Sequence, residues 1–226
     1  MTGGSGVIGR AICYRLAAEG ALVYVCGTNH ERVSSVVNEI NEAGFQARPL
    51  VSNILEEDSV GSAFCQVMNL SSKIDLLVCC AGGGAREKSC GFIEQDMDVI
   101  DSVLNLNLRG GILCTKEACK YMVSRERGKI IIISSTVGLQ GMPAYSEYAA
   151  AKAGLMAFVK SIAMELAPTL PVWGLKSCTR CALHSRWQLC CLTDVAYPLR
   201  VIRCGVHGFA MNPCESRPDS NRALLS

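Results

Sequence analysis

The chain has 226 residues, half of them hydrophobic, and a formal net charge of +2. This length suits one core rather than two, and so small a charge gives no electrostatic basis for binding nucleic acid or an anionic membrane surface. The longest apolar run, "KIIIISSTVGL", is too short to span a bilayer, and the first residues lack the basic and apolar regions of an export signal. We therefore expect a cytoplasmic protein without nucleic-acid or membrane partners.

Helical and strand-like segments alternate along the chain. The first, "GVIGRAICYRLAAEG", repeats Ile8, Ile12 and Leu16 along one helical stripe. The segments that follow are a strand at 21–27, a helix at 30–44, a strand at 47–53, a helix at 56–70, a strand at 74–80 and, after further helix, a strand at 129–135. Strands that are unbroken apolar runs are covered on both faces. The pattern predicts an α/β fold with a doubly wound parallel sheet, Rossmann-like, in three α/β/α layers.

The glycines of "TGGSGVIG" stand directly before the first helix, at Gly3, Gly6 and Gly9. Such glycines let a phosphate approach the backbone N–H groups of a helix start. Glycine spacing alone is weak support, because tight turns also collect glycine. The position before the first helix favours a nucleotide-binding turn, which would also include Gly4 and Ser5.

The stretch "AYSEYAAAKAGL" (144–155) places a lysine four residues after a tyrosine. Positions four apart share one face of a helix, so Tyr148 and Lys152 can point into one space, whereas Tyr145 has Ala149 there. An isolated Tyr-x-x-x-Lys is more often ordinary packing with a snorkelling lysine. A fixed cation would, however, lower the pKa of Tyr148 from roughly 10, which suits a proton donor.

Taken together, these segments resemble the short-chain dehydrogenase/reductase family over residues 2–168. The matching pieces are "TGGSGVIG", "CCAGG", "NLNLRG", "IIISSTVG" and "YAAAK", and their order and separations are more specific than any single piece. Ser135 falls thirteen residues before Tyr148, and Asn107 falls in the family's upstream asparagine motif. Ser134 is the weaker serine candidate, because neighbours in a strand point to opposite faces.

The resemblance implies an oxidoreductase that transfers a hydride between NADP(H) and a carbonyl or alcohol substrate. In reduction Tyr148 would donate the proton while Ser135 orients the carbonyl. Lys152 would also bind the ribose hydroxyls, and Asn107 would hold a water in the proton relay. Tyr145 is left to packing or the pocket rim. The cofactor would contact Gly3, Gly4, Ser5, Gly6, Gly9, Thr28, Asn53, Ile54, Ala81, Gly82, Tyr148 and Lys152.

The choice of cofactor depends on "VCGTN", at the end of the strand over 21–27. NAD sites usually place a carboxylate there, and this segment has none. Thr28 and Asn29, with Arg32 or Arg10, could instead receive a 2′-phosphate, so we expect NADP(H), with NAD as the alternative. Thr28 could also simply cap the next helix.

For the substrate, "YAAAKAGL" most resembles the 3-oxoacyl-[acyl carrier protein] reductases, which reduce a β-keto thioester. Sugar, polyol and steroid dehydrogenases share this half of the chain and stay open, as does a catalytically incompetent truncated or regulatory variant. The helix "EYAAAKAGLMAFVKSIAMELA" is apolar or small on nearly all sides, which predicts burial on more than one side. We expect a homo-oligomer through this helix and the one at 111–124, with burial inside a single core as the alternative.

Both ends of the chain depart from the family. Members have a central strand leading into the glycine turn, whereas here Met1 stands directly before Thr2 and Gly3. The usual Asn-Asn-Ala-Gly reads "CCAG" in this chain. After "SIAMELAP" nothing matches, and the residues from Leu170 onward contain seven Lys/Arg, three Asp/Glu and six cysteines. We therefore expect a dinucleotide-binding and catalytic domain over 1–168 and a divergent tail over 169–226, with the fold incomplete at both ends.

The fourteen cysteines do not require a disulfide framework, because a chain of this size has an ample apolar core. Within the tail, Cys178 and Cys181 have the spacing of a zinc-ligand pair. The residues that would complete a site, His184, Cys190 and Cys191, lack the usual second pair spacing. We interpret the cysteines as mostly small buried residues and predict no metal site.

Overall fold

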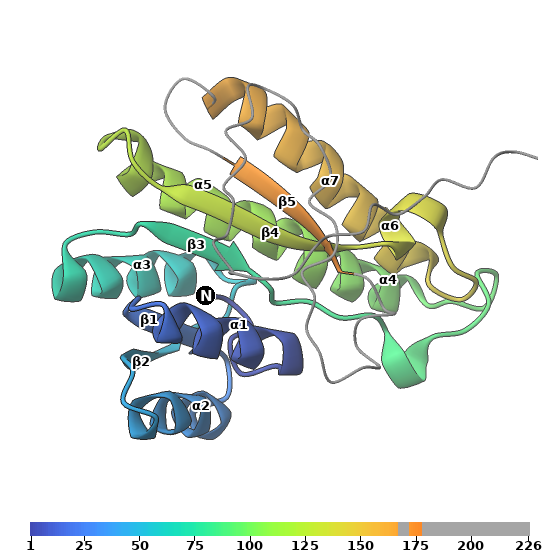
Figure 1. Ribbon diagram of the computed structural model, residues 1–226. Coiled ribbons are helices and arrows are strands. Elements are labelled where there is room, and N and C mark those ends of the chain that lie inside the picture. The colour runs from blue at the N-terminus through green and yellow to red at the C-terminus, as the bar shows by residue number, and fades with distance from the viewer. Residues whose placement is uncertain (167–171, 178–226) are drawn as a thin grey trace, which may run out of the picture. The chain divides into compact units, whose positions relative to one another are not determined.

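The computed structural model of the chain describes residues 1–166 and 172–177 (Figure 1). The predicted alternation of helices and strands is confirmed. The helices and strands are α1 (Val7–Ala18), β1 (Val23–Gly27), α2 (His30–Glu42), β2 (Ala47–Val51), α3 (Glu57–Ser71), β3 (Leu76–Cys79), the 3₁₀ turn η1 (Arg86–Lys88), α4 (Met97–Leu104), the π-helical turn η2 (Asn105–Arg109), α5 (Gly110–Val123), β4 (Lys129–Ser135), α6 (Val137–Gln140), α7 (Ser146–Leu166) and β5 (Val172–Ser177). The two segments that were considered for a zinc site and rejected, 178–181 and 184–191, lie outside the described residues.

All strand pairs are parallel, as predicted. Strand β1 pairs with β2, while β3, β4 and β5 form a second sheet in that order. Only Met1 and Thr2 lie between these two sheets, and Thr2 forms a parallel bridge with Cys79. Backbone hydrogen bonds of Met1 to β1 and of Thr2 to β3 thus join the two sheets.

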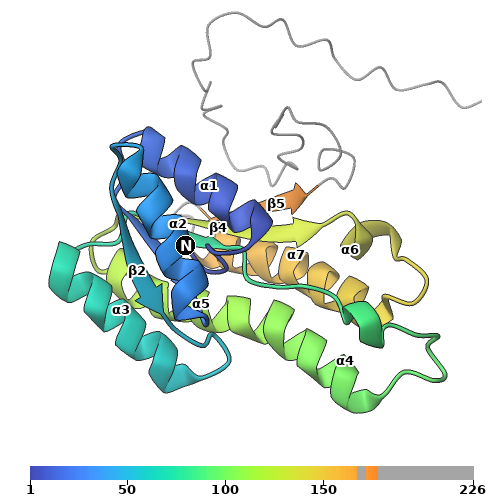
Figure 2. The same cartoon turned by 90° about the horizontal axis from the view of Figure 1, so that it is seen from below.

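Helices cover the strands on both sides (Figure 2). Helices α1 and α2 pack against β1 and β2, and α2 buries the apolar stripe Val33, Val36, Val37 and Ile40. Helices α3, α5 and α7 lie on the other side of the strands and enclose a larger apolar core with β3 and β4. The three-layer prediction is confirmed, and the C-terminal ends of the strands meet at one edge.

Strand β5 was not expected from the sequence, since it lies in the segment that was assigned to the tail. It pairs with β4 from Ile130↔Val172 to Ser135↔Ser177. The segment "VWGLKS" carries a glycine at its centre and no regular alternation, so its local pattern is weak. Strand β5 therefore forms because β4 offers backbone hydrogen-bond partners, although its own sequence shows little strand preference.

Helix α7 buries one face through contacts within the chain, at Glu147, Ala151, Lys152, Leu155 and Val159. A Cβ on Gly154 would lie 3.2 Å from Leu108 of η2, and Gly111 of α5 faces Leu155 at the same distance. Gly154 therefore admits a neighbouring element of the same chain, whereas Ala150, Ala153 and Ala157 on another face of α7 are exposed. Within the described part of the chain, no helix combines the length and apolar character needed to cross a bilayer.

The eight cysteines in the described residues are all free thiols. They differ in burial, so we expect them to differ in reactivity. Burial raises the pKa of Cys79 to about 12 and that of Cys13 to about 11, whereas Cys65 is exposed. Because the thiolate is the nucleophile, we expect iodoacetamide at pH 8 to alkylate Cys65 and to spare Cys13 and Cys79. Mass spectrometry of digested protein would measure this, with a urea-unfolded sample as the control. Alkylation of Cys79 in the folded chain would contradict the buried placement.

Candidate active site

Tyr148 and Lys152 lie one turn apart near the start of α7, beside the C-terminal end of β4. The Nζ atom of Lys152 lies over the ring of Tyr148, 5.5 Å from its centroid. Lys152 is only 4% exposed, and its ammonium donates a 3.1 Å hydrogen bond to the carbonyl oxygen of Ile133. The helix thus places the two side chains in one space, as their spacing indicated, and β4 fixes the lysine.

The pKa values of this pair are set mainly by burial. Burial raises the pKa of Tyr148 above its ordinary 10.0, while a hydrogen bond with the Ser135 side chain acts in the opposite direction. Burial also lowers the pKa of Lys152, partly offset by the nearby thiols of Cys80 and Cys79. The sequence led us to expect a lowered pKa at Tyr148. The protein groups alone instead favour the neutral phenol, because the effect of burial on the pKa outweighs that of the hydrogen bond with Ser135.

The two serines at the end of β4 have different partners. The hydroxyl of Ser134 donates to the backbone carbonyl of Lys152 at 2.9 Å, so it fixes α7 to the strand. Ser135 is 4% exposed; its hydroxyl accepts from the backbone N–H of Val137 and interacts with the phenol of Tyr148. Ser135 is therefore the serine that is positioned beside the tyrosine.

Tyr145 packs against the loop that follows β3. Its ring is edge-on to that of Tyr148, with centroids 6.4 Å apart. A Cβ on Gly84 would lie 2.9 Å from Cε1 of Tyr145. Tyr145 therefore occupies the packing position that the sequence left to it, next to the half-buried Tyr148.

Asn107 lies in the π-helical turn η2 and is 1% exposed. Its amide nitrogen donates to the carbonyls of Gly83 (2.7 Å) and Val103 (2.8 Å), and its oxygen accepts from the N–H of Gly83 (3.0 Å). Asn107 thus ties the loop after β3 to the helix that carries the π-turn, a helix irregularity that often marks functional sites. Both of its donor hydrogens are used by backbone carbonyls, so any bound water would have to donate to its oxygen.

The glycine turn is closed by contacts that leave no room for side chains. A Cβ on Gly9 would lie 2.0 Å from the carbonyl oxygen of Gly3, and one on Gly3, whose φ is +63°, would lie 2.6 Å from the nitrogen of Ala81. The N–H of Gly4 donates to the carbonyl of Cys26, so the turn is tied to β1. Ser5 lies against Gly27, where a Cβ would be 2.9 Å from its hydroxyl oxygen.

Helix α1 begins at this turn with Gly6 as its N-cap, and no side chain caps it. Its first N–H groups and the positive end of its dipole are therefore available to an anion. The narrow glycine cradle and the uncapped helix start both suit the pyrophosphate of a dinucleotide. These features fit the group that the sequence resemblance implied.

At the end of β1, Asn29 and not Thr28 caps α2, because the Asn29 side chain accepts from the N–H of Arg32 at 2.8 Å. Thr28 is exposed. Of the two candidate arginines, Arg10 pairs with Glu39 at 2.7 Å. The structure therefore rejects the capping interpretation of Thr28 and leaves Arg32, in the first turn of α2, as the cation nearest to it in sequence.

The other expected cofactor contacts lie at the ends of β2 and β3. The Asn53 side chain closes the start of α3 by accepting from the N–H of Leu55 and donating to Glu56. Ile54 is 7% exposed and packs into the main core. A Cβ on Gly82 would lie 2.5 Å from the Asn107 oxygen and 3.2 Å from Nζ of Lys152. Gly82 thus brings the loop after β3 against the catalytic candidates, and Ala81 contacts the glycine turn.

Two residues that the sequence analysis did not single out also contribute. Thr2 is 5% exposed, and its hydroxyl accepts from the N–H groups of Cys80 (3.2 Å) and Ala81 (3.3 Å). Where the family usually has Asn-Asn-Ala-Gly this chain has "CCAG", and the Thr2 hydroxyl holds the backbone of this segment. Cys80 lies near enough to raise the pKa of both Tyr148 and Lys152. Only the tertiary fold brings either residue to the site.

Comparison with known proteins agrees with this geometry. A family model described as short chain dehydrogenase matches residues 1–173. The chain is 40% identical over 169 residues to the 3-oxoacyl-[acyl-carrier-protein] reductase FabG of Aquifex aeolicus, covering 74% of this chain and 67% of that protein. It is 35% identical over 168 residues to the 3-oxoacyl-[acyl-carrier-protein] reductase of Synechocystis, with the same two coverages. A crystal structure of a metagenomic short-chain oxidoreductase in complex with NADP aligns with a TM-score of 0.74 and 27% identity, covering 79% of this chain and 80% of that one.

Proposed function

Because this chain belongs to the short-chain dehydrogenase family, we propose that it transfers a hydride between NADP(H) and a carbonyl or alcohol substrate, with a 3-oxoacyl thioester as the substrate. The observation that carries this proposal is the placement of Tyr148, Lys152 and Ser135 together beside the loop after β3. That loop also contacts the glycine turn through Ala81. Proton donor and nucleotide cradle thus share one edge of the sheet.

The chemistry divides between the cofactor and the chain. Bound NADPH would supply the hydride. Tyr148 would donate its phenolic proton to the carbonyl oxygen of the substrate, and Ser135 would hold that oxygen by a hydrogen bond. The ammonium of Lys152 would hold the ribose hydroxyls and stabilise the phenolate once the proton has left. Asn107 would keep the loop after β3 in position and offer its oxygen to a relay water.

The preference for NADP(H) follows from the end of β1, where Thr28 is exposed and no carboxylate follows in "VCGTN". The related structure that binds NADP supports the same choice. We expect NADPH to bind at least about tenfold more tightly than NADH, and Thr28→Asp to reverse the order because a carboxylate repels the 2′-phosphate. Titration of cofactor fluorescence measures both constants, with Thr28→Val as the neutral control. Tighter binding of NADH to the unmodified chain would contradict the assignment.

The thioester is supported by the two relatives named as 3-oxoacyl-[acyl-carrier-protein] reductases. Acetoacetyl-CoA with NADPH is the direct assay, and sugar, polyol and steroid substrates with NAD or NADP test the alternatives. Faster turnover of any of those would replace the thioester in the proposal. A homo-oligomer through α7 and α5 and a cytoplasmic location belong to the same proposal, and light scattering at micromolar concentration tests the oligomer.

A catalytically incompetent or regulatory variant is the second candidate, and the divided sheet is the observation that favours it. Strands β1 and β3 belong to separate sheets, which the backbone of Met1 and Thr2 bridges by hydrogen bonds. A folded chain that binds no NADPH would favour this candidate. Binding with turnover would exclude it.

A further inference from the structure

The loop that leads into α3 is bound to the C-terminal end of the π-helical turn η2. The guanidinium of Arg109 donates to the carbonyl of Leu55 at 2.9 Å and pairs with the carboxylate of Glu57 at 3.2 Å. In addition, a Cβ on Gly110 would lie 2.7 Å from Cδ1 of Ile54, so a side chain there would displace the isoleucine. The last residue of η2 and the first residue of α5 therefore hold this loop.

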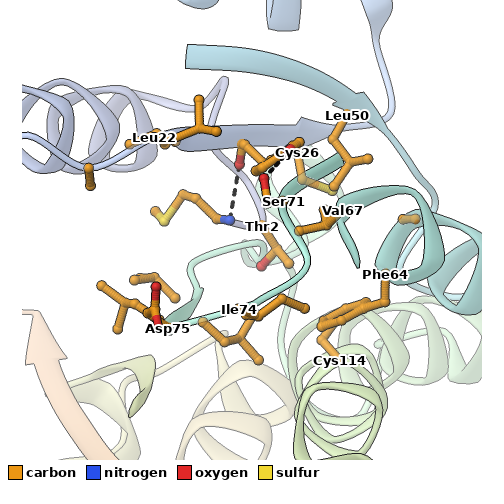
Figure 3. Close-up of a pocket in the computed structure, with 18 of the residues that line it drawn as sticks. Thr2, Leu22, Cys26, Leu50, Phe64, Val67, Ser71, Ile74, Asp75 and Cys114 are labelled. Atoms are coloured by element: carbon orange, nitrogen blue, oxygen red, sulfur yellow. Dashed lines mark hydrogen bonds between the residues drawn. The ribbon is translucent and has the colours of Figure 1, made fainter. Parts of the chain in front are cut away.

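Helices α3 and α5 pack against each other beyond these contacts. Phe64 of α3 and Cys114 of α5 lie side by side in the main apolar core (Figure 3). Ile54 is 7% exposed and belongs to the same core. The side chain of Arg109 is 49% exposed, and exposed ion pairs contribute little to folding stability. Apolar packing therefore holds the two helices together, and Arg109 can be replaced without unfolding the chain.

The turn η2 also carries Asn107, two residues before Arg109. The Asn107 side chain accepts from the N–H of Gly83 at 3.0 Å and donates to the carbonyl of Gly83 at 2.7 Å. A Cβ on Gly82, the preceding residue, would lie 3.2 Å from Nζ of Lys152. A displacement of η2 would therefore move the loop after β3 relative to the lysine.

A path of hydrogen bonds and short backbone segments thus leads from Asn53 to Gly83. The side-chain oxygen of Asn53 accepts from the N–H of Leu55 at 3.1 Å, and the carbonyl of Leu55 accepts from Arg109. The backbone of η2 joins Arg109 to Asn107, which bonds to Gly83. Asn53 is expected beside the adenine of the cofactor. The path therefore joins the adenine end of the site to the proposed catalytic residues.

We propose that Arg109 is a positioning residue, which transmits the binding of the cofactor's adenine at Asn53 to Asn107 and so fixes the loop after β3. This inference rests on the proposed function, because it needs a dinucleotide at Asn53. A bound adenine would restrict the loop that Arg109 contacts, and the guanidinium would in turn restrict η2. Adenine binding and the order of the hydrogen bond between Asn107 and Gly83 are thus linked.

The N–H of Gly83 is a direct reporter, because it donates to the Asn107 side chain. Its hydrogen exchange can be followed by NMR in the full chain labelled with ¹⁵N-glycine. Adenosine 2′,5′-bisphosphate is the probe, since it contains the adenine end of NADPH without the nicotinamide. We expect saturation with this probe to slow the exchange at least about threefold. In Arg109→Met the probe should bind with an affinity within about threefold of the original, and the slowing should be lost.

Two further variants separate positioning from a general effect of the substitution. Arg109→Lys keeps a cation that can donate to the carbonyl of Leu55, so it should restore at least about half of the slowing. Arg15→Met is the matched control, because Arg15 forms an exposed ion pair with Glu19 on α1, which packs on β1 and α2. It should behave like the unmodified chain.

Steady-state kinetics with acetoacetyl-CoA give a second readout. Arg109→Met should lower kcat at least about fivefold and change the KM for NADPH less than about twofold, because it disturbs the position of Asn107 and leaves the adenine site in place. The urea unfolding midpoint should stay within error of the original. An unchanged kcat would contradict the inference.

The outcomes distinguish this inference from the proposed function. A folded chain that does not bind adenosine 2′,5′-bisphosphate would overturn both, because the adenine site would be lacking. Binding that leaves the exchange of the Gly83 N–H unchanged would overturn the inference alone. Equal slowing in the unmodified chain and in Arg109→Met would do the same, as would a loss of slowing that Arg109→Lys does not restore or that Arg15→Met shares.

Discussion

Tyr148→Phe is expected to lower kcat for NADPH-dependent reduction of acetoacetyl-CoA by at least about 100-fold, the scale of general acid catalysis. The ring would remain in place under Nζ of Lys152, and only the proton would be lost. The dissociation constant for NADPH should therefore change by less than about threefold. Stopped-flow or steady-state kinetics and fluorescence titration measure the two quantities separately.

Tyr145→Phe is the matched control for this prediction. Tyr145 packs edge-on against Tyr148 and against Gly84, and both contacts are made by its ring. We expect it to retain at least half of the activity. If Tyr145→Phe removed turnover and Tyr148→Phe did not, the roles of the two tyrosines would have to be exchanged.

The protonation state of the Tyr148 phenol determines in which direction the reaction rate changes with pH. Burial raises the pKa of Tyr148 above 10.0, so the phenol remains protonated at neutral pH and can donate. Reduction should hold its rate through neutral pH and fall as pH rises through that raised value. Alcohol oxidation, which needs the phenolate as acceptor, should rise over the same range. If bound NADP⁺ lowers this pKa, both transitions move towards neutral pH together.

Gly9→Ala is expected to be the most damaging substitution in the glycine turn. The new Cβ would lie 2.0 Å from the Gly3 oxygen and 2.9 Å from the Gly4 Cα, and both are backbone atoms that cannot rotate away. The turn would have to open, so NADPH affinity should fall at least about tenfold and stability by about 1–3 kcal/mol, as in overpacked sites. Urea unfolding and fluorescence titration measure the two losses.

Gly61→Ala provides the control with the same chemical change. Gly61 lies inside α3, and a Cβ there meets no atom within 4 Å. Alanine in a helix interior is favoured over glycine by up to about 1 kcal/mol, so this variant should be more stable and bind NADPH normally. Equal loss of binding in both variants would show that Gly9 does not act through the turn.

The sequence by itself determined which segments form helices and strands, and it determined that Tyr148 and Lys152 lie on one side of a helix. Unbroken apolar runs at β1, β3 and β4 require cover on both faces, and the helical stripe of α2 contains the four residues that the fold buries. The four-residue interval between Tyr148 and Lys152 fixes their common side because helix geometry is local. Such features can be predicted because they depend on neighbours a few residues away.

The tertiary structure decided what depends on distant segments. Strand β5 forms because the edge of β4 offers backbone partners, although "VWGLKS" has little strand signal of its own. The raised pKa of Tyr148 depends on burial by the surrounding elements, which outweighs the hydrogen bond with Ser135. Thr2 reaches Cys80 and Ala81 across 78 and 79 positions. Contacts across such separations depend on how the whole chain folds, so no local sequence pattern predicts them.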